Sequence, residues 1–225
     1  MKTEDQASLV VVGASHAGCH LAEAARINGW QGKITVLGDE AYLPYHRPPL
    51  SKDFLAGKKS AEQILIKPAK LYEKHEIDFQ LNTRVSQIDR SAKLLHLAGG
   101  GTVAYDKLGL ALGARPRTVP TPGADKKGVF YLRGVNDIEG IRAFVGAGKQ
   151  AVIIGGGYIG LETAAALRKL QLKVSVIEMA PRILQRVTTE AISAFYERVH
   201  REEGVEIVTG AGVAEIHGDA TASAV

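Results

Sequence analysis

Cysteine is almost missing from this sequence of 225 residues, in which Cys19 is the only one. A single cysteine excludes an intrachain disulfide framework and a CxxC redox pair, and it fits a reducing compartment. The sequence also lacks any apolar run near the roughly 20 residues that a transmembrane helix needs. It starts with the polar stretch MKTEDQAS, which has no apolar core of a signal peptide. We therefore expect a cytoplasmic protein without a membrane partner.

Clusters of basic and aromatic residues are missing too, although the formal net charge is +4 and the pI is about 9.1. Scattered basic residues argue against nucleic acid as a partner. The seven histidines form no HxxxH pair and no other spacing typical of a metal site, so we predict no metal centre. The composition, 45% hydrophobic and 23% charged, is ordinary for a globular protein with one large domain or two of about 110 residues.

Glycine is abundant in one informative stretch, VIIGGGYIGL at Val152–Leu161. A strand pattern over 151–154 leads into it, and a helical pattern over 162–170 follows. The next predicted strand, 173–177, ends at Glu178, which lies 18 residues after Gly160. Glycines at 155, 157 and 160 allow a sharp turn, a close approach of a pyrophosphate and tight helix packing, while the acid reads a ribose. The stretch predicts a dinucleotide-binding unit.

A second version of this unit opens the chain, 142 residues earlier. A strand at Leu9–Val12, the turn GASHAG and a helical pattern over 19–27 are followed by a strand at 34–37 and by Asp39, 21 residues after Gly18. Ser15 stands where the middle glycine is expected, and a serine fits if its φ is negative. Two such units suggest two dinucleotides, as in a flavoenzyme that takes hydride from a nicotinamide.

Between these units the pattern predicts a loop, a meander and a connector. Pro48 and Pro49 make the loop AYLPYHRPPLSKDF rigid and extended, with Ser51 or Asp53 as the cap of a short helix. Its Arg47 and Lys52 either reach back over the cofactor or are solvated surface charges. A helix is expected at 71–76. It is followed by a β-meander of strands near 79 and at 85–88, 94–97, 103–105 and 108–112, with a hairpin tip at 99–101. A connector at 118–128 then leads to helices at 139–147 and 188–203 and a strand at 205–208. We place the domain boundary between residues 117 and 118.

Six segments in this order and spacing resemble one enzyme family: VVGASHAGCHLAEAAR, LGDEAYLPYHRPPLSK, ALGARPR, YLR, VIIGGGYIGLETAAALR and RVTTEAISAFYERVHREEGV. The sequence is similar to the FAD- and NADH-dependent ferredoxin reductases of bacterial monooxygenase systems. The resemblance implies an α/β fold with two Rossmann-like domains of the glutathione-reductase type, each a three-layer ββα structure. Residues 1–117 would bind FAD and residues 118–225 NADH. Hydride would pass to the flavin, and single electrons would pass to an acidic [2Fe–2S] ferredoxin that supplies a cytochrome P450 or another oxygenase.

The resemblance also implies the site residues. Those expected to contact FAD are Gly13, Ser15, His16, Ala17, Gly18, Asp39, Arg47, Lys52, Val85, Ala111, Gly113 and Arg133. Those on the NADH side are Gly155, Gly157, Tyr158, Ile159, Glu162 and Glu178. We expect Lys52 near the flavin ring and Glu178 to favour NADH over NADPH by charge repulsion, which Arg182 and Arg186 could soften. Tyr158 either shields the flavin or packs internally, and Glu162 either binds the carboxamide or places a favourable charge at a helix N-terminus. The cofactor performs the redox chemistry, so no catalytic acid or base is named.

Alternatives come from the same residues. Disulfide reductases and thiol-based NADH oxidases need a cysteine beside the flavin, but residues 41–52 contain none, and Cys19 is expected to be a small buried residue. A non-catalytic dinucleotide-binding module, or a sensor like apoptosis-inducing factor, stays open. The family continues beyond 225 residues with the rest of the nicotinamide domain, a segment that completes the FAD domain and a C-terminal domain. We therefore expect an incomplete FAD sheet here, and the activity of this chain is a separate question from that of the family.

Overall fold

A computed structural model describes residues 6–225; the polar start at 1–5, where we read no signal peptide, lies outside the described residues. The chain forms two compact units. The first unit comprises the residues up to 46 together with 61–115, and the second unit comprises 47–60 together with 116–225. Within residues 6–225 no helix is long and apolar enough to cross a membrane.

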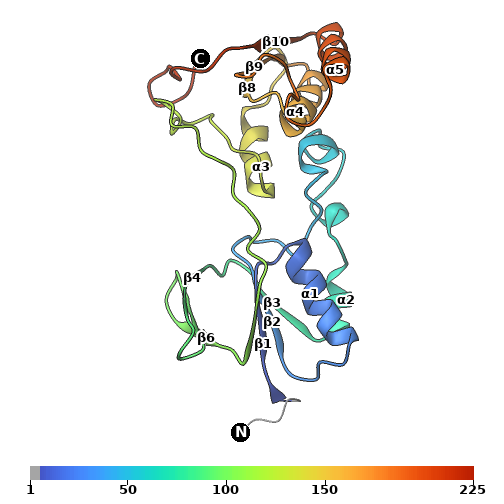
Figure 1. The fold of residues 1–225 in the computed structure, drawn as a ribbon, viewed down its shortest axis with the longest axis vertical. Coiled ribbons are helices and arrows are strands. Elements are labelled where there is room, and N and C mark those ends of the chain that lie inside the picture. Colours follow the sequence, from blue (N-terminus) through green and yellow to red (C-terminus); the bar gives the residue numbers. More distant parts are fainter. Residues whose placement is uncertain (1–5) are drawn as a thin grey trace. The chain divides into compact units, whose positions relative to one another are not determined.

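The first unit is built on a parallel sheet with the strand order β3-β2-β1-β7. Its strands are β1 (Leu9–Val12), β2 (Ile34–Leu37), β3 (Ile77–Gln80) and β7 (Lys107–Leu110). Helix α1 (His16–Ile27) connects β1 to β2, and α2 (Ala69–Lys74) precedes β3 (Figure 1). Every residue of β1 and β2 is buried, because the sheet is covered on both faces.

The alternation of side chains along β1 divides the core into two layers. Leu9 and Val11 pack with Cys19 and Ala22 of α1, whereas Val10 and Val12 pack with Leu95 of an antiparallel three-stranded sheet. This smaller sheet consists of β4 (Val85–Asp89), β5 (Leu94–Leu97) and β6 (Thr102–Ala104). The predicted hairpin tip at 99–101 joins β5 to β6 and is confirmed.

The predicted meander is wrong at its first and last strands. The expected strand near residue 79 is β3, which pairs in parallel with β2 and belongs to the main sheet. We expected residues 108–112 to continue it, but β7 pairs in parallel with β1 and therefore belongs to the main sheet. Leu108 still contacts the layer under the meander, which explains why an apolar pattern alone could not separate the two sheets.

Cys19 is buried, as predicted, with 2% of its surface exposed. Burial raises the pKa of the Cys19 thiol, which keeps it protonated and poorly nucleophilic. The neighbouring Tyr72 hydroxyl is also buried, and its pKa is raised for the same reason. These two groups serve the packing of α1 and α2 against the sheet.

The second unit repeats the parallel arrangement with the strand order β10-β9-β8. Its elements are α3 (Val135–Phe144), β8 (Gln150–Ile154), α4 (Tyr158–Lys169), β9 (Lys173–Glu178), α5 (Glu190–Glu202) and β10 (Val205–Thr209) (Figure 1). Helix α4 contacts β8 and β9, and α5 contacts β10.

Two predicted helix starts in this unit are wrong by four residues. Helix α4 begins at Tyr158 instead of 162, because extended backbone at Gly157 forms its N-cap. Helix α3 begins at Val135 instead of 139, because the Asp137 carboxylate accepts hydrogen bonds from the backbone N–H groups of Arg133 and Gly134. The patterns located both helices but missed the turns that start them.

The segment 47–60 packs with the second unit, although it connects β2 to β3 of the first and the sequence placed it in the first domain. It contains the helical turn η2 (Leu50–Phe54) and is followed by η3 (Glu62–Ile64). Leu50, Phe54 and Leu55 are buried. The Arg142 guanidinium of α3 lies 4.6 Å from the centre of the Phe54 ring and donates to the Phe54 carbonyl oxygen. Neither Ser51 nor Asp53 caps η2, because Pro49 occupies the N-cap.

Replacing Phe54 by alanine tests this assignment. Removing a buried phenylalanine costs about 3–5 kcal/mol, and the loss should fall on the second unit. Hydrogen exchange followed by mass spectrometry should show faster exchange in α3 and α4, with β1–β3 unchanged. Lys58→Ala, at an exposed position of the same segment, is the control. Faster exchange confined to the first unit would show that the segment belongs there.

Candidate functional site: two glycine turns

The first glycine turn brings the start of α1 against the end of β1. Gly13 has a φ of 115°, which favours glycine. A Cβ on Gly18 would stand 1.8 Å from the Gly13 carbonyl oxygen, so only glycine allows this approach. Ser15 has a φ of −130°, which meets the condition under which a serine fits this position, and its side chain makes no cap hydrogen bond. The first N–H groups of α1 and the Ser15 hydroxyl are therefore suited to an anion.

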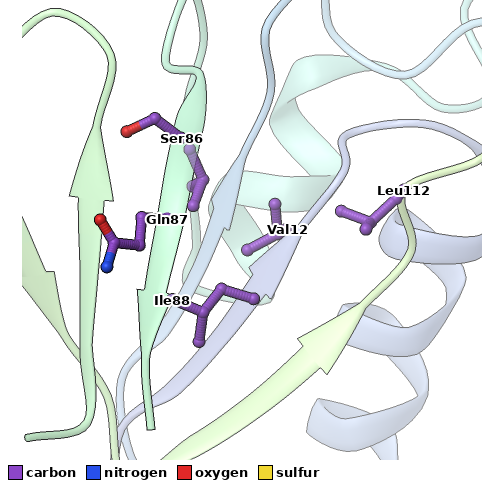
Figure 2. Close-up of a pocket in the computed structure, with 6 residues that line it drawn as sticks. Val12, Ser86, Gln87, Ile88 and Leu112 are labelled. Carbon is purple, nitrogen blue, oxygen red and sulfur yellow. The ribbon is translucent and has the colours of Figure 1, made fainter.

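The end of β7 forms one edge of this turn. A Cβ on Gly13 would stand 2.1 Å from the Ala111 carbonyl oxygen, which places Ala111 against the turn. Next to it lies a cavity of about 330 Å³ that Val12, Leu112 and residues 85–88 line. In Figure 2, Val12 of β1 and Ile88 of β4 point toward one another across this cavity. Val85, the predicted adenine contact, thus borders a cavity at the same end of the sheet as the turn.

Asp39 follows β2 and has an exposed side chain. Its Oδ2 atom lies 3.5 Å from Nη1 of Arg84, which precedes Val85. On the turn itself, the His16 ring lies 3.2 Å from His46, measured between Nε2 and Nδ1. Sequence reasoning missed Arg84 and His46, because both become neighbours of the turn only through the fold.

The second glycine turn has the same geometry. Gly155 has a φ of 114°, and a Cβ on Gly160 would stand 2.1 Å from the Gly155 carbonyl oxygen. A Cβ on Gly157 would meet no atom within 4 Å. The space over Gly157 is therefore open to a ligand, as the spacing of the fingerprint requires.

Glu178 is tied to this turn by both of its oxygens. Oε2 accepts a hydrogen bond of 2.7 Å from the Gly156 N–H, and Oε1 accepts one of 2.8 Å from the Ala180 N–H. Gly156 itself admits no side chain, because a Cβ would stand 2.8 Å from Cγ2 of Ile183 and 3.1 Å from Cβ of Glu178. Gly156 is absent from the predicted site residues, although the run of three glycines at 155–157 was a signal for it.

Glu162 of α4 has two polar partners in segment 47–60. Its Oε2 atom lies 2.6 Å from Lys52 Nζ and 2.6 Å from Ser51 Oγ. Glu162 lies beyond the first turn of α4, so the interpretation as a favourable charge at a helix N-terminus is wrong. Segment 47–60 thus brings Lys52 to a residue that lies 110 positions later in the chain.

The Arg47 side chain contacts the backbone of Arg133 in the second unit. Nη1 of Arg47 donates a hydrogen bond of 2.7 Å to the Arg133 carbonyl oxygen, and the Arg133 side chain is exposed. Tyr158 and Ile159 at the start of α4 are 48% and 56% exposed, so Tyr158 does not pack into the core of its unit.

The predicted site residues therefore fall into two groups. The first unit holds Gly13, Ser15, His16, Ala17, Gly18, Asp39, Val85, Ala111 and Gly113. The second unit holds Arg47, Lys52, Arg133, Gly155, Gly157, Tyr158, Ile159, Glu162 and Glu178. Three residues expected at FAD, Arg47, Lys52 and Arg133, belong to the second group.

The family of the chain follows from comparison with known proteins. Residues 7–225 match the model of the pyridine nucleotide-disulphide oxidoreductases, and the chain belongs to this family. The family's ferredoxin reductases use FAD and NAD(H).

Similar proteins of this family are ferredoxin reductases. The chain is 42% identical over 209 residues to putidaredoxin reductase CamA of Pseudomonas putida, covering 92% of this chain and 50% of that protein. It is 41% identical over 210 residues to the probable ferredoxin reductase CtmF of Castellaniella defragrans, covering 93% and 51%. A crystal structure of a covalent putidaredoxin reductase–putidaredoxin complex matches with a TM-score of 0.89 and 40% identity, covering 95% of this chain and 52% of that one. The chain spans about half the length of the curated relatives it matches.

Substitutions at Gly156 and Gly157 distinguish a glycine that is needed for packing from a glycine that faces open space. Gly156→Ala should destabilise the second unit by about 1–3 kcal/mol, because its Cβ overlaps Ile183. Gly157→Ser should change stability by less than about 0.5 kcal/mol, because serine is a good N-cap and the first turn carries Ser15 there. Urea unfolding followed by circular dichroism measures both. Equal destabilisation would contradict the packing described for Gly156.

Proposed function

We propose that the first unit binds FAD, that the second binds NADH, and that the chain belongs to a reductase that passes electrons from NADH through FAD to a [2Fe–2S] ferredoxin. The ferredoxin would supply a cytochrome P450 or another oxygenase. The observation that carries the proposal is the duplicated turn, in which a tight glycine approach, the start of a helix and a carboxylate after the next strand recur in each unit. The similar proteins named as ferredoxin reductases support the choice of reaction.

The first turn fits the diphosphate of FAD. The N–H groups at the start of α1 and the Ser15 hydroxyl would hold the phosphate oxygens, and the partial positive charge of the helix end favours them. Asp39 would accept the adenosine ribose hydroxyls, and Val85 would contact the adenine through its backbone. The exposed Asp39 carboxylate and the cavity beside Val85 leave room for these groups.

The second turn fits NADH. Open space over Gly157 would admit the pyrophosphate, and Glu178 would read the adenosine ribose. The Gly156 and Ala180 N–H groups orient the Glu178 carboxylate while each oxygen keeps a further lone pair for a ribose hydroxyl. Glu162, further along α4, would bind the nicotinamide carboxamide.

The flavin, when bound, supplies the chemistry that turns a hydride into single electrons. Lys52 is the residue of this chain suited to balance the negative charge of a reduced flavin, and Glu162 holds its ammonium group at 2.6 Å. The contacts of Arg47, Lys52 and Arg133 with FAD stay predictions from the family resemblance. The ferredoxin partner is proposed because a similar reductase has been crystallised in a covalent complex with putidaredoxin.

A non-catalytic module, or a redox sensor with the same fold, is the alternative. The absence of cysteine from residues 41–52 argues against thiol-based members of the family but does not distinguish a sensor from a reductase. Turnover distinguishes them.

The first test of the proposal is purification of the chain with FAD. We expect a yellow protein with a flavin band near 450 nm. NADH oxidation with ferricyanide and with a [2Fe–2S] ferredoxin is then measured, because a reductase would be fast with both acceptors. A sensor would be slow with both acceptors. A colourless protein that gains no bound flavin on addition of FAD would contradict the proposal for this chain.

The second test is the choice between NADH and NADPH. A 2′-phosphate about 4 Å from Glu178 meets a repulsion of about 1–4 kcal/mol per unit charge, so NADH should bind at least about tenfold more tightly. Arg182 is not available to compensate this repulsion, because its guanidinium already donates hydrogen bonds to Thr188, Ser193 and Gln185. Fluorescence titration of the chain with each nucleotide measures the ratio, and Glu178→Gln should reduce it. Equal affinities in the unsubstituted chain would contradict the role of Glu178.

A further inference from the structure

Two hydrogen-bond donors share one oxygen of the Glu162 carboxylate. Lys52 Nζ and Ser51 Oγ each lie 2.6 Å from Oε2. No hydrogen bond or ion pair within residues 6–225 reaches the other oxygen, Oε1, and the side chain is 33% exposed. The two oxygens of Glu162 are therefore chemically different: one is occupied from inside the protein and one is open.

Ser51 differs from Lys52 in how firmly it is held. Ser51 is only 4% exposed, and its neighbours Leu50 and Phe54 are buried in the second unit. The backbone of this turn is closed by hydrogen bonds of 3.0 Å from the N–H groups of Lys52 and Phe54 to the Pro49 carbonyl oxygen. The Lys52 side chain, in contrast, is 47% exposed and has a long flexible stem. Ser51 is thus the rigid partner of Glu162.

We propose that Ser51 is a positioning residue for the nicotinamide. By donating to Oε2, its hydroxyl fixes the rotation of the Glu162 carboxylate and turns Oε1 toward the N–H group of the nicotinamide carboxamide. This inference rests on the proposed function, because it assumes that the second unit binds NADH and that Glu162 meets the carboxamide. It adds a residue from segment 47–60 to the recognition of a ligand held by α4.

The chemistry of the carboxamide supports these different roles for the two oxygens of the Glu162 carboxylate. The amide N–H is a donor and an ionised carboxylate accepts only, so the pair is complementary. A hydrogen bond to a charged group contributes more than one between neutral groups, but only when the acceptor is held in place. Without Ser51, Lys52 alone would hold Glu162, and its exposed stem allows the carboxylate to rotate.

The experiment compares two dinucleotides that differ at one group. NAD⁺ carries the carboxamide, and 3-acetylpyridine adenine dinucleotide carries an acetyl group that has no N–H donor. Calorimetric titration of the full chain should show NAD⁺ bound about tenfold more tightly. Ser51→Ala should weaken NAD⁺ about fivefold and leave the acetyl analogue unchanged, so that the preference falls to about twofold. Ser51→Thr keeps the hydroxyl and should restore the preference.

Ser193 provides a matched control in the same unit. It is 1% exposed, and its hydroxyl accepts a hydrogen bond of 2.6 Å from Arg182 and donates one of 2.7 Å to the Ile183 carbonyl oxygen. Ser193→Ala therefore removes an equally buried hydroxyl next to a charged group without touching Glu162. It should lower the unfolding temperature but keep the tenfold preference. If Ser51→Ala unfolds during titration, Ser51→Cys, whose thiol is a weak donor, replaces it with the same expected loss.

The outcomes separate the inference from the proposed function. If the unsubstituted chain binds both dinucleotides equally, the assignment of Glu162 to the carboxamide fails, and the role of Ser51 fails with it. If it binds neither, the NADH site itself is refuted. If it prefers NAD⁺ and Ser51→Ala keeps that preference, the NADH site stands and only the positioning role of Ser51 is overturned.

Discussion

The architecture of both units depends on how closely a helix can approach the strand before it. At each turn a glycine on the helix faces the carbonyl oxygen of the glycine that ends the strand, at a distance that no side chain permits. This contact fixes the direction of α1 and α4, and with it the direction of the first N–H groups of both helices. Under the proposed function, phosphate recognition follows from this packing, and a larger residue at Gly18 or Gly160 would disturb both together.

The two units differ in whether the sheet face that points away from the first helix is covered. Val10 and Val12 of β1 are 2% and 8% exposed, because the small antiparallel sheet covers them. Their counterparts in β8, Val152 and Ile154, are 42% and 43% exposed. Equal apolar strands in the sequence therefore have unequal surroundings in the described residues.

Much of this arrangement could be predicted from the sequence, for physical reasons. Glycine spacing, apolar strand patterns and the acid at the end of the second strand are local signals, and the structure shows both turns where the patterns located them. Ser15 is a further example, because the sign of its φ decided whether serine fits. The contacts of Arg84 with Asp39 and of Ser51 with Glu162 could not be predicted, because each depends on residues that only the tertiary fold brings together. Hydropathy also cannot say which unit a buried residue such as Phe54 joins.

Segment 47–60 makes the chain non-modular, although its units are compact. The polypeptide passes from one unit to the other at 46/47, returns at 60/61 and passes again at 115/116. A contiguous piece that begins after residue 115 would lack Leu50, Phe54 and Leu55, which fill part of the second unit's interior. Recombination between relatives would therefore need two cut sites inside the first half to exchange all residues of the second unit together. A substitution near residue 50 lies in the first half of the sequence, but it changes the packing of the unit that the second half forms.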